Sequence, residues 1–174
     1  MSKTVLVAGA TSVLGQAFIE KYKDQYNIVS LSRVDIYWDA LVHADVLLNC
    51  VGDVNLIGLR HTSEKEFDDM IEANIKVPFL LAQSFMNGSR DDGHIINIGS
   101  TRSISTAPNK AIYAATKAAL RFMTQSIGIE TNIKATLICP GNFAEAGTIE
   151  ATVNAIHFCI QNPEVKEMII NGMV

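Results

Sequence analysis

Short apolar segments alternate along this chain with longer segments of helical pattern, and this alternation restricts the fold more than any other feature. Several of the apolar segments carry apolar side chains on both faces, as parallel strands covered by helices do. We predict strands at residues 4–8, 28–32, 45–51, 94–99, 134–139 and 168–170. Helices are predicted at 13–24, 63–87, 109–128 and 148–161. The order predicts one α/β domain over residues 1–174, with helices on both faces of a doubly wound parallel sheet.

Two signals refine the second predicted helix. Ser63 and Glu66 have the spacing of a capping box, which marks a helix start. Pro78 lies inside the same segment and predicts a kink or an early break. Before this helix, the second and third strands are separated only by residues 33–44, which is too short for a helix–strand–helix excursion and fits a loop or one short helix.

Composition excludes several classes of function. A chain of 174 residues with 48% hydrophobic residues forms a globular core, and a net charge of −4 without a basic run gives no footprint for nucleic acid. No apolar segment approaches the roughly 20 residues that span a bilayer, and the start has no signal-peptide pattern. Cys50, Cys139 and Cys159 are predicted to be buried, reduced thiols, and the four histidines lack metal-ligand spacing. We therefore expect a cytoplasmic protein without a nucleic-acid, membrane or metal partner.

Ser100, Tyr113 and Lys117 form the most informative polar constellation. Ser100 follows a predicted apolar strand, and a spacing of four places Tyr113 and Lys117 on one face of an Ala-rich helix. A phenol has a pKa of about 10, and a neighbouring ammonium lowers that pKa toward neutrality. With the Ser100 hydroxyl holding a substrate oxygen, the group suits proton transfer to a carbonyl or from an alcohol. A Tyr-x-x-x-Lys pair alone is weak evidence, because many helices carry one by chance.

The first strand leads into a glycine-containing turn before the first helix. Such a turn lets the backbone approach a pyrophosphate, and the helix amino terminus offers free N–H groups. The alternative is a turn that needs glycine for its geometry only. The residues of this turn that we assign to nucleotide binding are Gly9, Thr11, Ser12, Val13, Leu14 and Gly15.

The end of the second strand bears on which dinucleotide would bind. An acidic residue there would accept hydrogen bonds from a ribose 2′-hydroxyl, but this chain has Ser32 and Arg33. A hydroxyl and a guanidinium suit a 2′-phosphate instead, so the sequence predicts NADP(H) more than NAD(H). The alternative is an exposed arginine without a ligand.

Taken together and in this order, the motifs resemble the short-chain dehydrogenase/reductase superfamily, in a classical-like but shortened form, nearly from end to end. The resemblance implies a Rossmann-like fold and a nicotinamide-dependent oxidoreductase. The matching positions are Gly9 and Gly15, the segment DVLLNCVG at 45–52, Asn74, Ser100, Tyr113, Lys117, and Pro140 with Gly141.

The resemblance also implies a role for each matching residue. Tyr113 would be the general acid or base, Lys117 would bind the nicotinamide ribose, and Ser100 would orient the substrate oxygen. Asn74 would hold a water in the proton relay, although a buried structural amide is the alternative. The cofactor groove would include Asn49, Val51, Gly52, Pro140 and Gly141. Asn49 has a second interpretation, as a strand-end cap without direct contact.

Several positions depart from the family pattern. Val13 stands where the family usually has its middle glycine, and the 33–44 interval lacks most of a helix–strand–helix section. Tyr37 or Trp38 could replace the floor of the adenine pocket that this section provides, by stacking on the adenine. The segment after Gly141 is brief, and the family places its substrate lid there, so we expect an open, shallow substrate site.

Two functions follow from these motifs. The first is an NADP(H)-dependent carbonyl reductase or alcohol dehydrogenase acting on a small carbonyl or alcohol substrate. The second is a non-catalytic NADP(H)-binding scaffold or sensor, which the departures at Val13 and 33–44 favour. The apolar residues of the 63–87 and 109–128 helices, together with the resemblance, predict a homodimer or homotetramer.

Overall fold

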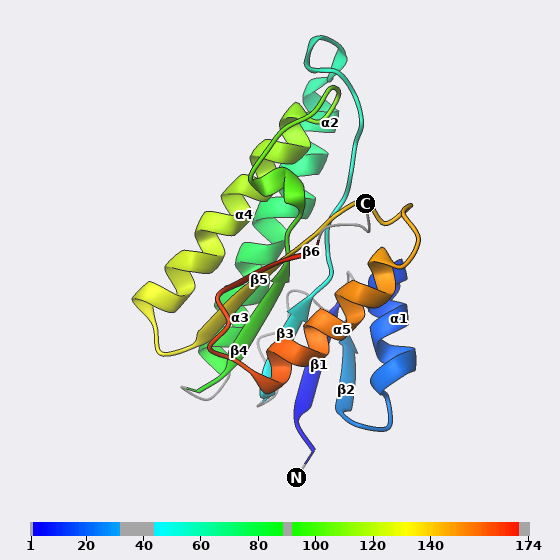
Figure 1. Cartoon of the computed structure of the whole chain (residues 1–174). Coiled ribbons are helices and arrows are strands. Elements are labelled where there is room, and N and C mark those ends of the chain that lie inside the picture. Colours follow the sequence, from blue (N-terminus) through cyan, green and yellow to red (C-terminus); the bar gives the residue numbers. More distant parts are fainter. Residues whose placement is uncertain (1, 32–43, 89–91, 171–174) are drawn as a thin grey trace.

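A six-stranded parallel sheet forms the centre of the molecule (Figure 1). The computed structural model describes residues 2–31, 44–88 and 92–170. Within them the strand order is β2-β1-β3-β4-β5-β6, and every neighbouring pair is parallel. The strands are β1 (Thr4–Ala8), β2 (Asn27–Leu31), β3 (Val46–Asn49), β4 (His94–Ile98), β5 (Lys134–Pro140) and β6 (Glu167–Ile170). The predicted Rossmann-like fold is confirmed, with strand ends shifted by one or two residues.

Helices cover both faces of the sheet, because successive residues of the central strands point to opposite sides. Val5 and Val7 of β1 pack with Phe18 of α1 (Val13–Tyr22) and Ile156 of α5 (Thr148–Gln161). On the other face, the neighbouring Leu6 of β1 lies in a cluster with side chains of α3 (Val77–Gly88), and α4 (Ala111–Glu130) packs beside β5. Figure 1 shows the two helix layers on either side of the strands.

The second predicted helix is interrupted just before its proline. It consists of α2 (Glu64–Ile71), a π-helical turn (Glu72–Lys76) and α3. The capping box of Ser63 and Glu66 opens α2, as predicted. Pro78 has no N–H, and its ring would clash with the carbonyl four residues earlier, at Asn74. The wider π turn accommodates this, so the expected disturbance lies N-terminal to Pro78 and buries Asn74.

A chain of buried amides and hydroxyls joins β3, β4 and α4. Asn49 Nδ2 donates to Asn97 Oδ1 at 2.9 Å, and Asn97 Nδ2 donates to Thr124 Oγ1 at 2.9 Å. Thr124 in turn donates to the Leu120 carbonyl at 2.8 Å. Because polar groups inside a protein are costly unless paired, this chain fixes α4 against the sheet. The helix that carries Tyr113 and Lys117 is thereby held in place.

The structure also bears on the predictions about cysteines, membrane spans, metal ligands and residues 32–43. Cys139 and Cys159 are buried free thiols as predicted, whereas Cys50 is only half-buried. No helix in the described part of the chain is both long and apolar enough to cross a membrane, and the residues described there include no cluster of metal-binding side chains. Residues 32–43 lie outside the described residues, and with them Ser32, Arg33, Tyr37 and Trp38. The inferences drawn from those four residues therefore stay predictions.

Candidate active site

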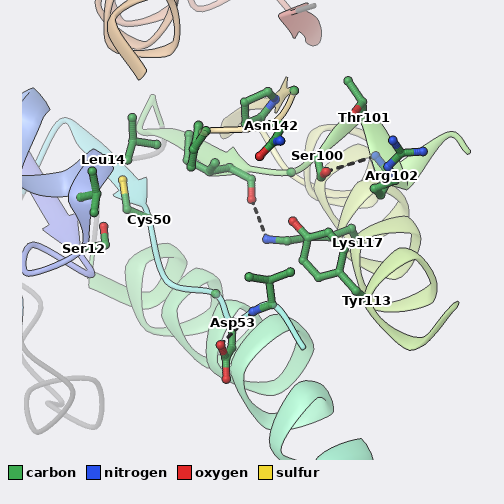
Figure 2. A pocket seen from close by; sticks show the side chains of 18 of the residues that line it. Ser12, Leu14, Cys50, Asp53, Ser100, Thr101, Arg102, Tyr113, Lys117 and Asn142 are labelled. Atoms are coloured by element: carbon green, nitrogen blue, oxygen red, sulfur yellow. Dashed lines mark hydrogen bonds between the residues drawn. The ribbon is translucent and has the colours of Figure 1, made fainter. Parts of the chain in front are cut away.

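A cavity of about 350 Å³ opens at the carboxyl edge of the sheet, where β1, β3, β4 and β5 end (Figure 2). Strand order reverses between β1 and β3, and ligands of open α/β sheets bind at such a reversal. Each of the four strands sends the segment that follows it to the cavity wall. Its lining residues are Ser12–Leu14 after β1, Cys50–Val54 after β3, Ile98–Arg102 at the end of β4, Lys110, Tyr113 and Lys117 around the start of α4, and Pro140–Phe143 after β5.

The turn after β1 has the geometry that its glycines predict. Gly9 adopts a φ of 75°, and a Cβ added there would lie 2.8 Å from the Cys50 carbonyl carbon. A Cβ on Gly15 would lie 2.5 Å from the Gly9 carbonyl oxygen, so α1 packs closely on the turn. Ser12 caps α1 by accepting a hydrogen bond from the Gly15 N–H at 3.1 Å. The first turn of α1, including exposed Val13, therefore faces the cavity with N–H groups that the helix leaves unpaired.

Ser100 and Tyr113 stand at the opposite end of the cavity from Ser12 (Figure 2). The Ser100 Oγ accepts a hydrogen bond from the Arg102 N–H at 3.1 Å, and its own hydroxyl hydrogen can donate to the Tyr113 oxygen. Burial raises the pKa of Tyr113 above its ordinary value, while the Ser100 hydroxyl and the Arg102 charge act in the opposite direction. Lys117 is not among the causes of this shift, so the predicted lowering of the Tyr113 pKa by Lys117 is not found.

Lys117 is a buried ammonium with one fixed acceptor. Its Nζ donates to the Ile98 carbonyl at 3.0 Å and lies 5.9 Å from the centroid of the Tyr113 ring. Burial lowers the pKa of Lys117 to about 8, so the ammonium is still the main form at neutral pH. Because the Lys117 ammonium is already fixed, it need not move to stabilise a negative charge that forms on a neighbouring group.

Ten of the predicted site residues line the cavity. They are Ser12, Val13, Leu14, Val51, Gly52, Ser100, Tyr113, Lys117, Pro140 and Gly141. Gly9 and Gly15 act through backbone geometry, and Thr11 is not among the lining residues.

The two asparagines lie behind the cavity wall. Asn49 Oδ1 accepts from the Val51 N–H at 3.0 Å, which agrees with the alternative of a strand-end cap. The Asn74 amide bonds both the N–H and the carbonyl of Asp53, each at 2.9 Å. This arrangement agrees with a structural amide that holds the wall at Asp53. The water-holding role of Asn74 stays a prediction.

Ten residues of the cavity wall were not predicted from the sequence. Most of them are sequence neighbours of predicted site residues. Only their location directly after a strand could have indicated that they line the cavity. The missed residues are Cys50, Asp53, Val54, Ile98, Gly99, Thr101, Arg102, Lys110, Asn142 and Phe143. Burial raises the pKa of the Cys50 thiol to about 12, so this cysteine is no thiolate nucleophile at neutral pH.

Comparison with known families agrees with this geometry. The family described as short chain dehydrogenase matches residues 34–154, a stretch that contains Ser100, Tyr113 and Lys117 but not the glycine turn. The chain belongs to the short-chain dehydrogenase family. Members of this family are oxidoreductases that bind a nicotinamide cofactor and act on small molecules.

Individual relatives cover different shares of the chain. An uncharacterized oxidoreductase of Thermotoga maritima is 31% identical over 108 residues, which are 59% of this chain and 43% of the relative. One from Staphylococcus epidermidis is 28% identical, over 80% of this chain and 77% of the relative. The structure of 4-hydroxyisoleucine dehydrogenase complexed with NADH and succinate superposes with a TM-score of 0.82 at 22% identity, covering 97% of each chain. That similarity shows the shared fold.

The glycine turn generates a prediction about stability. Replacing Gly9 by Ala should lower the free energy of unfolding by about 1–3 kcal/mol, because a side chain is strained at positive φ and would meet the Cys50 backbone. Gly128→Ala is the matched control: it lies in α4 with its nearest neighbour at 4.0 Å, and it should stabilise by about 0.5 kcal/mol. Urea unfolding of both variants measures this, and an unchanged Gly9→Ala protein would contradict the described turn.

Proposed function

We propose that the chain is an NADP(H)-dependent carbonyl reductase or alcohol dehydrogenase. The observation that carries this proposal is the meeting of Ser100, Tyr113 and Lys117 at one end of a cavity whose other end is the amino terminus of α1. A single cavity of this kind brings an anion-binding helix end and a proton-transferring phenol to the same ligand.

The residues present fit a nicotinamide dinucleotide. The closely packed glycine turn and the unpaired N–H groups of α1 suit its diphosphate, and Pro140 and Gly141 border the end near Tyr113. A nicotinamide held there supplies or accepts the hydride. The assignment of the groove residues, including Val51 and Gly52, is part of this proposal.

The chain's own groups handle the proton. In reduction, the Tyr113 hydroxyl donates its proton to the substrate carbonyl oxygen, and in oxidation the phenolate takes it back. The Ser100 hydroxyl donates a hydrogen bond to the same oxygen and holds it beside the phenol. Lys117, fixed by the Ile98 carbonyl, stabilises the phenolate left after proton donation. The Ser100 hydroxyl and the Arg102 charge offset part of the effect of burial on the pKa of Tyr113.

The preference for NADP(H) rests on Ser32 and Arg33, in the segment outside the described residues. A guanidinium after the second strand suits a 2′-phosphate, whereas an acidic residue would suit a free ribose hydroxyl. The 4-hydroxyisoleucine dehydrogenase structure holds NADH, and at 22% identity its cofactor does not decide the preference of this chain.

One observation favours a second candidate, a non-catalytic NADP(H)-binding scaffold or sensor. Val13 lines the phosphate end of the cavity with 64% of its surface exposed, where a glycine would leave more room. A bulky residue there would weaken or displace the diphosphate. The complete set of Ser100, Tyr113 and Lys117 supports the enzyme over this candidate.

Tyr113→Phe tests the proposed chemistry. Loss of the phenolic proton should lower kcat by about 10²–10⁴-fold, the usual contribution of general acid–base catalysis, with cofactor binding largely kept. Tyr22→Phe is the matched control, since Tyr22 stacks on His157 between α1 and α5 and does not line the cavity. Steady-state turnover with a carbonyl panel and NADPH measures the effect. Equal kcat in the Tyr113→Phe variant and the parent protein would refute the mechanism.

We also propose a homodimer or homotetramer that buries the outer side of α3 and α4. Phe79 and Phe122 on these helices are 48% and 66% exposed, which is unusual for phenylalanine.

Phe122→Glu should shift the assembly toward the monomer in light scattering. Phe158→Glu on α5, at a side chain 49% exposed, is the control and should leave it unchanged. A monomeric parent protein at high concentration would contradict the proposal.

A further inference from the structure

The cavity is positively charged although the whole chain is negative. Arg102, Lys110 and Lys117 line it, and Asp53 is the single acidic side chain among the described lining residues. The net charge of the chain is −4. Lys117 gives one of its three N–H donors to the Ile98 carbonyl and lies 5.9 Å from the centroid of the Tyr113 ring, so Arg102 and Lys110 are the other two cations of the cavity wall.

Arg102 carries a charge that neutral groups hold in place. Its Nη1 donates to the Thr106 carbonyl at 3.2 Å and reaches the Ser105 Oγ at 3.5 Å. No acidic side chain pairs with it in the described part of the chain. Figure 2 places Arg102 beside Thr101, at the end of the cavity where Ser100 and Tyr113 stand. An anionic group on a substrate bound at Tyr113 would therefore lie near this guanidinium.

Lys110 stands at the N-cap of α4, three residues before Tyr113. It makes no capping hydrogen bond, the first turn of α4 has no acidic residue, and none of the described residues forms an ion pair with it. N-caps favour Ser, Thr, Asp or Asn, and a cation at the positive end of a helix is unfavourable. Helix stability thus gives no reason for a lysine here, whereas an anion in the adjoining cavity does.

Asp53 does not neutralise this end of the cavity. Its Oδ1 accepts a hydrogen bond from the Val54 N–H at 2.8 Å. In Figure 2 its carboxylate is directed away from Ser100 and Tyr113. The positive charge of Arg102 and Lys110 is therefore available to a substrate.

We propose that the substrate of this site is a small carboxylate, an oxo acid or hydroxy acid whose carboxylate is bound by Arg102 and Lys110. The inference rests on the oxidoreductase function proposed above. In the oxidative direction the hydroxy acid would lose a hydride to the oxidised nicotinamide and its hydroxyl proton to the Tyr113 phenolate, giving the oxo acid and the Tyr113 phenol. The same cavity of about 350 Å³ would also hold the nicotinamide end of the cofactor.

Matched pairs of substrates test this class. Reduction of 2-oxobutanoate and 3-oxobutanoate is compared with reduction of their methyl esters, which keep the carbonyl and lose the charge. At least one acid should exceed its ester in kcat/KM by tenfold or more, the size expected of a hydrogen bond to a charged group. Equal turnover of acids and esters, or a preference for the esters, would overturn the carboxylate assignment and leave the oxidoreductase function standing.

Charge-removing variants locate the binding groups. Lys110→Gln and Arg102→Gln should each lower the acid-to-ester ratio of kcat/KM about tenfold, and the ratio is insensitive to a loss of folded protein. Lys65→Gln, on an exposed lysine of α2 that does not line the cavity, should keep the ratio. An unchanged ratio in both cavity variants would overturn the roles of Arg102 and Lys110.

A binding measurement separates this inference from the proposed function. Butanoate and butanamide are titrated into the protein with bound NADPH, and the fluorescence of the nicotinamide is followed. Selective binding of butanoate that Lys110→Gln weakens, without turnover of any carbonyl, would support the anion site and refute the oxidoreductase function. Equal binding of the acid and the amide would overturn the anion site.

Discussion

The shared register of four parallel strands determines where every group of the candidate site lies. Ala8 of β1 pairs with Asn49 of β3, which pairs with Asn97 of β4, and β4 continues in step with β5. All four strands therefore end at one edge, and the chain must leave each of them next to the others. The backbone hydrogen bonds of the sheet therefore place four segments side by side at this edge. They are the glycine turn, residues 50–54, the segment that contains Ser100 and the turn at Pro140.

Burial then gives these groups their chemical character. Lys117 is buried and Tyr113 is half-buried, and burial lowers the pKa of the lysine and raises that of the phenol. The buried amides around them are paired, as in the links from Asn74 to Asp53 and from Asn97 to Thr124. A site of this kind is rigid before any ligand arrives, and fixed dipoles that need not reorient are the main source of transition-state stabilisation in enzymes.

The sequence predicted best what short local patterns determine. Alternating apolar segments gave the layer order, and the spacing of Tyr113 and Lys117 correctly placed both on one helix facing one cavity. Pro78 predicted a kink or break in the second helix, but the form that this break takes, a π turn at Glu72–Lys76, depends on how Pro78 fits against the preceding carbonyls in the packed helix. Arg102 and Lys110 were also missed, since only the folded loop between β4 and α4 brings them to the cavity. The direction in which the pKa of Tyr113 shifts depends on how deeply the side chain is buried. The spacing of residues along a helix does not indicate this depth.

Titration of the purified protein with NADPH and with NADH, followed by the fluorescence of the reduced nicotinamide, tests the central claim most directly. The claim is that the cavity between α1 and Tyr113 holds a nicotinamide dinucleotide. We expect saturable enhancement with both nucleotides, and tighter binding of NADPH because of Arg33. Failure to bind either nucleotide would contradict the claim. It would mean that the Val13 side chain blocks binding of the diphosphate. Ser100, Tyr113 and Lys117 would then lie in a cavity without a hydride donor.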